Sequence, residues 1–205
     1  MGSSYLAIAG NMGAGKSSLV DFLWKAYGCK PFFEPQDINP YLTDFYRDMR
    51  SWAFHSQMFF LTKKFRHYLD LQARRPRRPM VLDRTIYEDA EIFAANLHRM
   101  RLIPRREFAV YWDLYQTILD VLEPPRVLIY LTCSLRTMRK RIGRRGRQAE
   151  GPIQTGYLKK LQCLYDRWIE RYDRSPVISL ATDHADYLDD FLVREELEKK
   201  LRSYL

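Results

Sequence analysis

The chain has 205 residues, of which 46% are hydrophobic and 29% charged, and its formal net charge is +9. This length suits a single α/β domain covering residues 1–205, and no apolar run approaches the roughly 20 residues that span a membrane. The cysteines Cys29, Cys133 and Cys163 are odd in number and widely spaced, which argues against a disulfide framework and a zinc site. Because the N-terminus also lacks the layout of a signal peptide, we expect a cytoplasmic protein with no membrane partner.

The excess positive charge indicates an anionic partner. A basic surface could bind nucleic acid, and a basic site could bind a polyphosphate. Much of the charge lies in residues 74–78 and residues 136–147. The first cluster holds a proline and precedes a strand, so we interpret it as a solvated loop. The second cluster is a candidate functional element.

A phosphate-binding loop is the first feature along the chain. An apolar strand expected at residues 5–9 leads into the sequence GNMGAGKSS, and an amphipathic helix is expected to begin near Lys16. Glycines let backbone amides turn toward an anion at the positive end of that helix. Lys16 would reach the β- and γ-phosphates, and the Ser17 hydroxyl would bind Mg2+. The alternative is a glycine-rich turn with no ligand, which the flanking strand and helix disfavour. The pattern predicts nucleotide binding by Gly10, Asn11, Met12, Gly13, Ala14, Gly15, Lys16, Ser17 and Ser18.

The next segment predicts a short strand and two helices. Residues 30–34 are expected to form a strand that ends in Glu34, and open α/β sheets place ligand-contacting groups at such strand ends. Glu34 is therefore a site candidate. Apolar residues at helical spacing predict helices at about 41–49 and 51–73. Gln57 is polar within this apolar stripe, and the spacing alone favours a position on the solvent side.

A second strand, at residues 80–83, also ends in an acid, Asp83. An acid at this place resembles the end of a Walker B strand, which helps to hold Mg2+. The alternative is an ordinary helix cap. Helices are expected at residues 86–101 and 105–122, and the Pro124-Pro125 pair ends the second of them.

An arginine-rich segment follows the strand expected at residues 127–131. Its basic side chains repel one another unless an anion binds, so residues of about 141–152 are predicted to form a lid over phosphates. The alternative is a basic surface helix that contacts nucleic acid or has no ligand.

The order of the elements predicts the fold class. A helix at about 153–173, a strand at 176–180 and a helix at about 186–203 complete the chain. Strands that alternate with helices favour an α/β protein with a five-stranded, mostly parallel sheet flanked by helices. Together with the phosphate loop and the arginine-rich lid, this arrangement predicts a P-loop kinase fold. The chain has no Asn-Lys-x-Asp motif of a switch GTPase and is short for an ATP-driven motor. We therefore expect phosphoryl transfer from a nucleoside triphosphate to a small acceptor.

Several further motifs follow the phosphate loop in order. They are Glu34-Pro35, NPYLTDFY at residues 39–46, Trp52 with Gln57 five residues later, DRTIYEDAEIFA from Asp83, and RIGRRGRQAE at residues 141–150. On these motifs the chain resembles the deoxyribonucleoside kinases, and among them the bacterial deoxyadenosine/deoxycytidine kinases. The resemblance extends over nearly the whole chain.

The resemblance assigns roles to these positions. It implies that Glu34 takes the proton from, or orients, the 5'-hydroxyl of the deoxyribose, and that Arg84 binds near that hydroxyl and the incoming phosphate. Lys16, Glu34 and Arg84 are thus the candidate catalytic residues. Asp83 and Ser17 would be tied to Mg2+. Tyr46 and Glu150 match the pair that holds the sugar 3'-hydroxyl, and the donor phosphates would be contacted by Arg141, Arg145 and Arg147.

The resemblance also gives Gln57 a different meaning, because the family uses this position to recognise the base. A planar amide pairs with adenine or cytosine and can rotate to suit guanine. Asp89 matches an acidic position that contacts the base, and Lys64 matches a position that purine-preferring relatives fill with Arg. Lys does not reproduce the bidentate Arg fork, so this departure leaves the base preference open. Phe93 and Trp52 are candidates for the pocket lining or, equally, for the core.

The sequence thus predicts a Mg2+-dependent kinase that moves the γ-phosphoryl of ATP, or of another nucleoside triphosphate, to the 5'-hydroxyl of a deoxynucleoside. Deoxyadenosine is the first choice of acceptor, with deoxycytidine as a further one. The alternatives are a deoxyguanosine kinase of the same fold and a nucleic-acid-binding P-loop ATPase. The expected partners are small molecules rather than nucleic acid, and the resemblance implies a homodimer.

Overall fold

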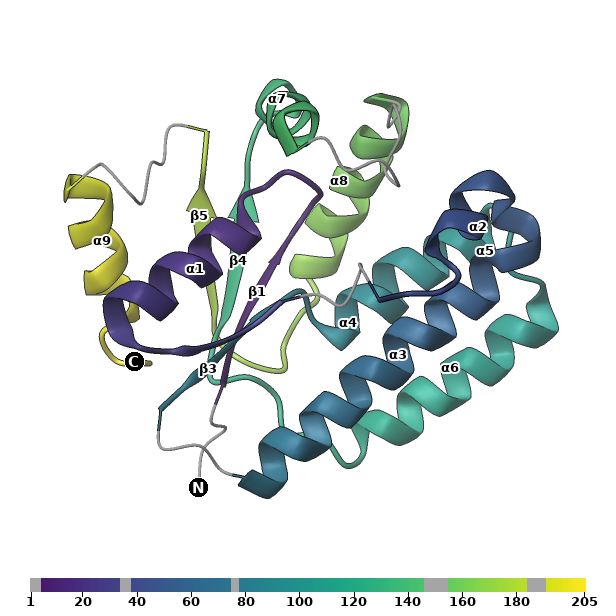
Figure 1. The fold of residues 1–205 in the computed structure, drawn as a ribbon, viewed down its shortest axis with the longest axis horizontal. Helices are drawn as coiled ribbons and strands as arrows, with labels where there is room; N and C mark the ends of the chain where they lie inside the picture. Colours follow the sequence, from purple (N-terminus) through teal and green to yellow (C-terminus); the bar gives the residue numbers. More distant parts are fainter. Residues whose placement is uncertain (1–4, 34–37, 75–77, 146–154, 184–190) are drawn as a thin grey trace.

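The computed structural model describes residues 5–33, 38–74, 78–145, 155–183 and 191–205 (Figure 1). Within these residues one sheet holds five strands, in the order β2-β3-β1-β4-β5. All neighbouring strands are parallel, so Ile8 of the central strand pairs with Asp83 on one side and Ile129 on the other. The predicted five-stranded sheet is confirmed, and it is wholly parallel. The strands are β1 (Tyr5–Gly10), β2 (Lys30–Phe32), β3 (Met80–Asp83), β4 (Leu128–Thr132) and β5 (Val177–Ala181).

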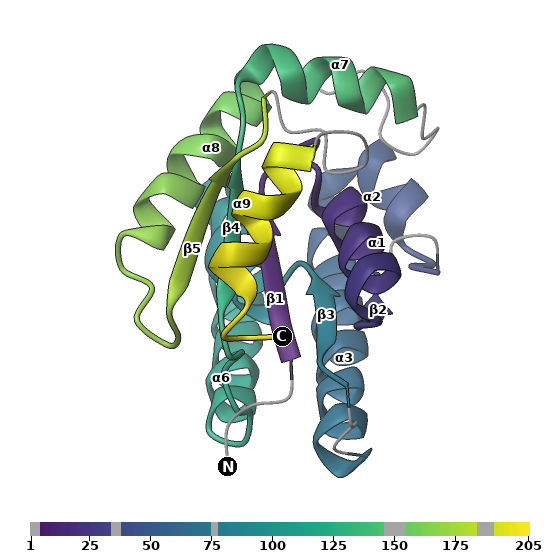
Figure 2. The ribbon, with the colours of Figure 1, turned by 90° about the vertical axis from the view of Figure 1, so that its left-hand side faces the viewer.

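Helices cover both faces of the sheet because successive side chains of a strand point to opposite faces. On β1, Tyr5, Ala7 and Ala9 belong to one hydrophobic cluster, which also takes in residues of α3 (Met49–Arg74), α6 (Arg105–Leu119) and α8 (Thr155–Ile169). Leu6 and Ile8 belong to the second cluster, with residues of α1 (Lys16–Tyr27) and α9 (Phe191–Leu201). Figures 1 and 2 show these two groups of helices on opposite faces.

The observed helices agree with the expected ones apart from their ends and one local change of geometry. The expected helix at residues 86–101 is α4 (Ile86–Glu88), η1 (Asp89–Ala94) and α5 (Ala95–Arg99), and η1 is a π-helix. The expected helix at 105–122 ends at Leu119, and that at 153–173 is observed over Thr155–Ile169. The two remaining helices are α2 (Leu42–Arg47) and α7 (Leu135–Arg145).

The carboxyl ends of the parallel strands share one edge of the sheet, where the loops after Gly10, Asp83, Thr132 and Ala181 come together. Helix α7 crosses above this edge (Figure 2). No helix of the described residues has the length and apolar character needed to cross a bilayer.

Candidate active site

The loop between β1 and α1 has the backbone of a phosphate cradle. Gly15 is the N-cap of α1 with a φ of 97°, a left-handed conformation that glycine adopts without steric cost. A Cβ atom on Gly13 would lie 2.7 Å from the carbonyl oxygen of Met138, so only glycine permits the close approach of α7. The buried Lys16 folds back over the loop, and its Nζ donates to the carbonyl oxygens of Gly10 at 2.9 Å and Asn11 at 3.1 Å.

Ser17 and Asp83 join the loop to the neighbouring strand. The Ser17 hydroxyl donates to Asp83 Oδ2 at 2.6 Å, and Asp83 Oδ1 is buried with no hydrogen-bond partner among the described residues. A hydroxyl beside a carboxylate with an unused oxygen suits Mg2+, which takes one or two protein ligands in addition to phosphates and waters. Among the described residues no three His, Cys, Asp or Glu side chains gather as a metal cage, and a Mg2+ site of this kind does not need one.

The first residue of the expected lid, Arg141, already lies on the phosphate loop. Its Nη1 donates to the carbonyl oxygens of Gly13 and Ala14, each at 3.3 Å, and its Nη2 donates to the carbonyl oxygen of Thr182 at 2.5 Å. Arg145 is exposed at the end of α7. These contacts bring a lid arginine to the loop that is expected to hold the donor phosphates.

Arg84 occupies a strained and enclosed position directly after β3. Its φ is 69°, a left-handed conformation that is uncommon outside glycine and marks functional sites. The backbone is fixed by a hydrogen bond of 2.9 Å from Arg84 N to Ile8 O. The guanidinium lies 4.3 Å from the centre of the Phe93 ring, in a cation–π contact. The side chain is thereby directed into a cavity.

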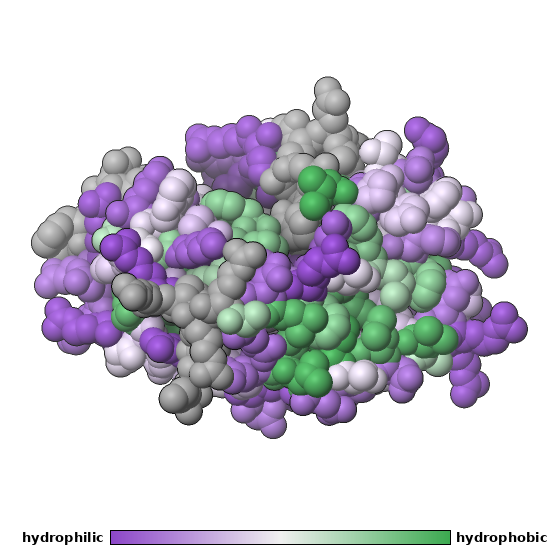
Figure 3. Space-filling view, turned by 60° about the horizontal axis from the view of Figure 1, so that its bottom comes forward, coloured by the Kyte–Doolittle hydropathy of each residue, from purple (hydrophilic) through white to green (hydrophobic). Residues whose placement is uncertain are grey.

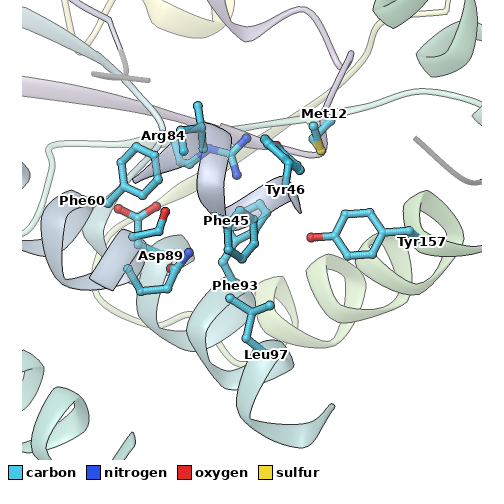
Figure 4. Close-up of a pocket in the computed structure, with 12 residues that line it drawn as sticks. Met12, Phe45, Tyr46, Phe60, Arg84, Asp89, Phe93, Leu97 and Tyr157 are labelled. Carbon is cyan, nitrogen blue, oxygen red and sulfur yellow. The ribbon is translucent and has the colours of Figure 1, made fainter. Parts of the chain in front are cut away.

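The cavity into which Arg84 points lies between α2, α3, η1 and α8 (Figure 4). In Figure 4 the Tyr157 hydroxyl points into this cavity from α8. Burial raises the pKa of that hydroxyl, against the opposing effect of Arg84, so Tyr157 is a hydrogen-bond donor at neutral pH. The lining residues are Met12, Leu42, Phe45, Tyr46, Ser56, Gln57, Phe60, Arg84, Asp89, Phe93, Leu97 and Tyr157.

Gln57 and Asp89 bring polar groups into this mostly apolar lining. Gln57 is only 6% exposed, contrary to the solvent-side position that the spacing alone favours, and its Oε1 has no hydrogen-bond partner in the part of the chain that the structure describes. Asp89 forms an ion pair with Lys64 at 2.6 Å. Lys64 does not line the cavity and lies against Asp89, with its Nζ also 3.3 Å from Thr85 O.

This arrangement of residues belongs to a known enzyme family. The sequence profile of the deoxynucleoside kinase family matches residues 6–205. The chain belongs to the deoxynucleoside kinase family. It is therefore a phosphotransferase with a P-loop kinase fold, and the resemblance inferred from its motifs is confirmed.

Relatives of this kinase match it over most of its length. The deoxyadenosine/deoxycytidine kinase of Bacillus subtilis (strain 168) is 34% identical, covering 92% of this chain and 87% of that protein. A deoxyguanosine kinase of Lactobacillus johnsonii is 35% identical, covering 94% and 88%. A deoxyadenosine kinase from M. mycoides, solved with the products dCMP and a flexible dCDP bound, is 30% identical with a TM-score of 0.81, covering 97% and 99%.

The remaining predicted site residues of the kinase either do not line the cavity or lie outside the described residues. Trp52 is not among the residues that line the cavity, and its ring stacks on Tyr41 with centroids 5.7 Å apart. Glu34, Arg147 and Glu150 lie outside the described residues, as does the part of the lid after residue 145. Their roles stay predictions.

The structure adds residues that the sequence reasoning missed. Glu88 is completely buried and accepts from Gly10 N at 3.2 Å, although the sequence presents it as an ordinary acid in the first turn of a helix. The Thr85-x-x-Glu88 spacing of a capping box was the available signal. Thr182 donates to Ala14 O at 2.9 Å from a loop that is distant in the sequence, and no local pattern marks it.

Proposed function

We propose that this kinase transfers the γ-phosphoryl group of ATP, or of another nucleoside triphosphate, to the 5'-hydroxyl of deoxyadenosine, and that it also accepts deoxycytidine. The observation that carries the proposal is the buried Gln57 side chain in the cavity, whose Oε1 accepts no hydrogen bond from any described residue. A buried acceptor without a donor destabilises the folded protein by about 1–3 kcal/mol, and a ligand that supplies the donor removes this cost.

The polar groups of the cavity favour bases that carry an exocyclic amino group. The Gln57 amide can accept one proton from adenine N6 and donate to adenine N1, and cytosine offers the same pattern at N4 and N3. Asp89, held as a carboxylate in its ion pair with Lys64, offers only acceptors to the second proton of that amino group. Guanine presents an acceptor, O6, at this edge. The Asp89 carboxylate would repel this oxygen, because both groups are hydrogen-bond acceptors.

The donor triphosphate would bind on the other side of Arg84. Backbone amides of residues 10–18, Lys16, and the arginines 141, 145 and 147 would surround its phosphates. Ser17 and Asp83 would hold Mg2+, and the bound ion would neutralise charge on the β- and γ-phosphates. The hydrogen bonds of Lys16 and Arg141 to loop carbonyl oxygens support this assignment, because both cations already lie at the loop.

For the transfer step we assign three tasks to individual residues. Glu34 would accept the proton of the 5'-hydroxyl or orient it, and Arg84 would stabilise charge on the moving phosphoryl group. Tyr46 and Glu150 would hold the sugar 3'-hydroxyl, so that the acceptor oxygen is in line with the γ-phosphate. The position of Tyr46 in the cavity lining supports its part of this assignment.

Deoxyguanosine is the second candidate acceptor. One of the most similar relatives, at 35% identity, is named a deoxyguanosine kinase, and the Gln57 amide can present its donor and acceptor in the opposite order after rotation. The presence of Lys64 rather than a bidentate arginine does not decide between the purines.

We also propose that the kinase acts in the cytoplasm as a homodimer formed through α3 and α6. Figure 3 shows apolar residues gathered on the face that carries these helices. The exposed members include Leu69 of α3, Val110 and Leu114 of α6, and Val121 just beyond it. Positions 110 and 114 are one helical turn apart and so share one side of α6.

An assay over the four natural deoxynucleosides, with ATP and GTP as donors and with and without Mg2+, tests the proposed reaction. We expect 5'-monophosphate product first from deoxyadenosine and then from deoxycytidine, with no need for nucleic acid. A preference for deoxyguanosine would select the second candidate. Turnover of ATP that depends on added DNA or RNA would contradict the proposal and favour a nucleic-acid-binding ATPase.

A further inference from the structure

A buried chain of hydrogen bonds connects the phosphate loop to Arg84. Glu88 is completely buried and receives four donors on its two oxygens. Its Oε2 accepts from Thr85 N at 2.7 Å and Thr85 Oγ1 at 3.0 Å, and its Oε1 accepts from Gly10 N at 3.2 Å and from the Tyr165 hydroxyl at 2.8 Å. The carboxylate thus ties the first glycine of the phosphate loop to the turn that follows Arg84.

Tyr165 extends the chain to the guanidinium itself. Its hydroxyl donates to Glu88 and accepts from Arg84 Nη1 at 3.3 Å. The Tyr165 ring is completely buried on α8 and packs against Phe93 at 6.4 Å between ring centroids. Phe93 in turn carries the Arg84 guanidinium on its face at 4.3 Å. Tyr165 and Phe93, which pack against each other, therefore both hold the Arg84 guanidinium.

We infer that Glu88 and Tyr165 are positioning residues for phosphoryl transfer, which hold the Arg84 guanidinium in register with the phosphate loop. The inference rests on the proposed role of Arg84 in the transfer step. Glu88 fixes the direction of the Tyr165 hydroxyl because a carboxylate only accepts hydrogen bonds. The hydroxyl must then give its proton to Glu88 and keep its lone pairs for Arg84. A guanidinium held in this way needs no reorganisation as charge develops on the transferred group.

The decisive variant is Tyr165→Phe, which removes one oxygen and keeps the buried ring. Because Arg84 would act on charge that develops in the transition state, we expect kcat to fall about tenfold while KM for both substrates changes less than about twofold.

Tyr130→Phe is the matched control. The Tyr130 hydroxyl also joins the sheet to α8, through Asp166 at 3.1 Å and Gln162 at 3.1 Å, and among the described residues it makes no hydrogen bond to Glu88 or Arg84. Its ring stacks on Tyr165 with centroids 6.1 Å apart, and the Phe substitution keeps this ring contact. We expect Tyr130→Phe to lower Tm by a similar amount and to keep kcat within about twofold.

A double-mutant cycle separates positioning from general stability. If Tyr165 acts through Arg84, then Tyr165→Phe should have little further effect on kcat when Arg84→Lys is already present. A wild-type kcat in Tyr165→Phe, an equal loss in Tyr130→Phe, or independent effects in the cycle would each overturn the inference. A wild-type kcat in Arg84→Lys would instead refute the proposed role of Arg84, and the positioning inference with it.

Glu88→Gln supplies a second measurement. The glutamine amide keeps the size of the side chain but replaces one accepting oxygen with an NH2 group. This NH2 group would face hydrogen-bond donors that face a carboxylate oxygen in the wild type. We expect a larger fall in kcat than in Tyr165→Phe. Circular dichroism should show that the variant remains folded. The double variant Glu88→Gln/Tyr165→Phe should be no slower than Glu88→Gln alone. Additive losses in this pair would contradict a shared function.

Discussion

Lys64 Nζ lies 2.6 Å from Asp89 Oδ2, and the two side chains are 2% and 4% exposed. The pair joins α3 to the π-helix η1 directly behind the cavity, so an acid that lines the cavity has its charge balanced from the protein side. In this arrangement Lys64 influences the base subsite through Asp89.

The first prediction follows from breaking this ion pair. Lys64→Met removes the cation that pairs with the buried Asp89 carboxylate, and we expect the free energy of unfolding to fall by about 3–5 kcal/mol in urea denaturation. Lys63→Met is the control, because Lys63 makes a single cation–π contact with Phe59 at 5.4 Å, and it should cost less than about 1 kcal/mol. The double variant Lys64→Met/Asp89→Leu should regain most of the stability. Equal losses in the two single variants would show that the pair does not balance a buried charge.

The second prediction concerns the buried Gln57 amide. Gln57→Met removes an acceptor that has no partner in the described structure, so the ligand-free protein should be as stable as the wild type or more so by about 1 kcal/mol. Its KM for deoxyadenosine should rise roughly tenfold or more, with KM for ATP unchanged. Isothermal denaturation and steady-state kinetics measure the two effects.

Asn96 provides the matched control for this variant. It is 1% exposed, its side-chain amide has no hydrogen-bond partner within the described ranges, and it is not among the residues that line the cavity. Asn96→Leu should therefore keep KM for deoxyadenosine. A large change in Asn96→Leu, or none in Gln57→Met, would remove Gln57 from base recognition.

Much of the fold and part of the site could be predicted from the sequence because their signals are local. The phosphate loop and the strand-end acid Asp83 belong to short patterns that are independent of the rest of the chain. The π-helix at Asp89–Ala94 could not be predicted, because apolar spacing over six residues does not distinguish it from an α-helix. The burial of Gln57 and Glu88 depends on packing between segments distant in sequence, for which local periodicity carries no information.

The third prediction tests the proposed Mg2+ site. Asp83→Asn keeps the volume of the side chain but removes its charge, and we expect the half-saturating Mg2+ concentration to rise about 10- to 100-fold in a titration at fixed ATP. Asp113→Asn, which changes an exposed acid of α6, is the control and should follow the wild-type curve. An unchanged Mg2+ requirement in Asp83→Asn would contradict the assignment of Asp83.

The fourth prediction tests the proposed dimer. Val110 is 62% exposed on α6, and a buried charge at the centre of an apolar interface opposes association. We expect Val110→Glu to convert the dimer to a monomer in size-exclusion chromatography with light scattering. Trp24→Glu, at an exposed apolar residue of α1, is the control and should remain dimeric. A Val110→Glu protein that remains dimeric would show that another face forms the interface.

The last prediction concerns stability in mild acid and His67. The imidazole stacks on Phe32 with ring centroids 3.4 Å apart, and its Nε2 is buried with no hydrogen-bond partner in the described structure. Burial lowers the pKa of His67 from 6.5 to about 4. Between these values the unfolded chain binds a proton that the folded chain does not, so stability falls as the pH falls from 6.5 toward 4. A fully buried ring would contribute about 3 kcal/mol to this loss, and partial exposure reduces the figure to about 1–2 kcal/mol.

His67→Phe keeps an aromatic ring on Phe32 and should flatten the stability curve in this pH window, as measured by urea denaturation at several pH values. The same change at the exposed His55 is the control. A His67→Phe protein with the wild-type slope would mean that other groups cause the loss of stability in acid.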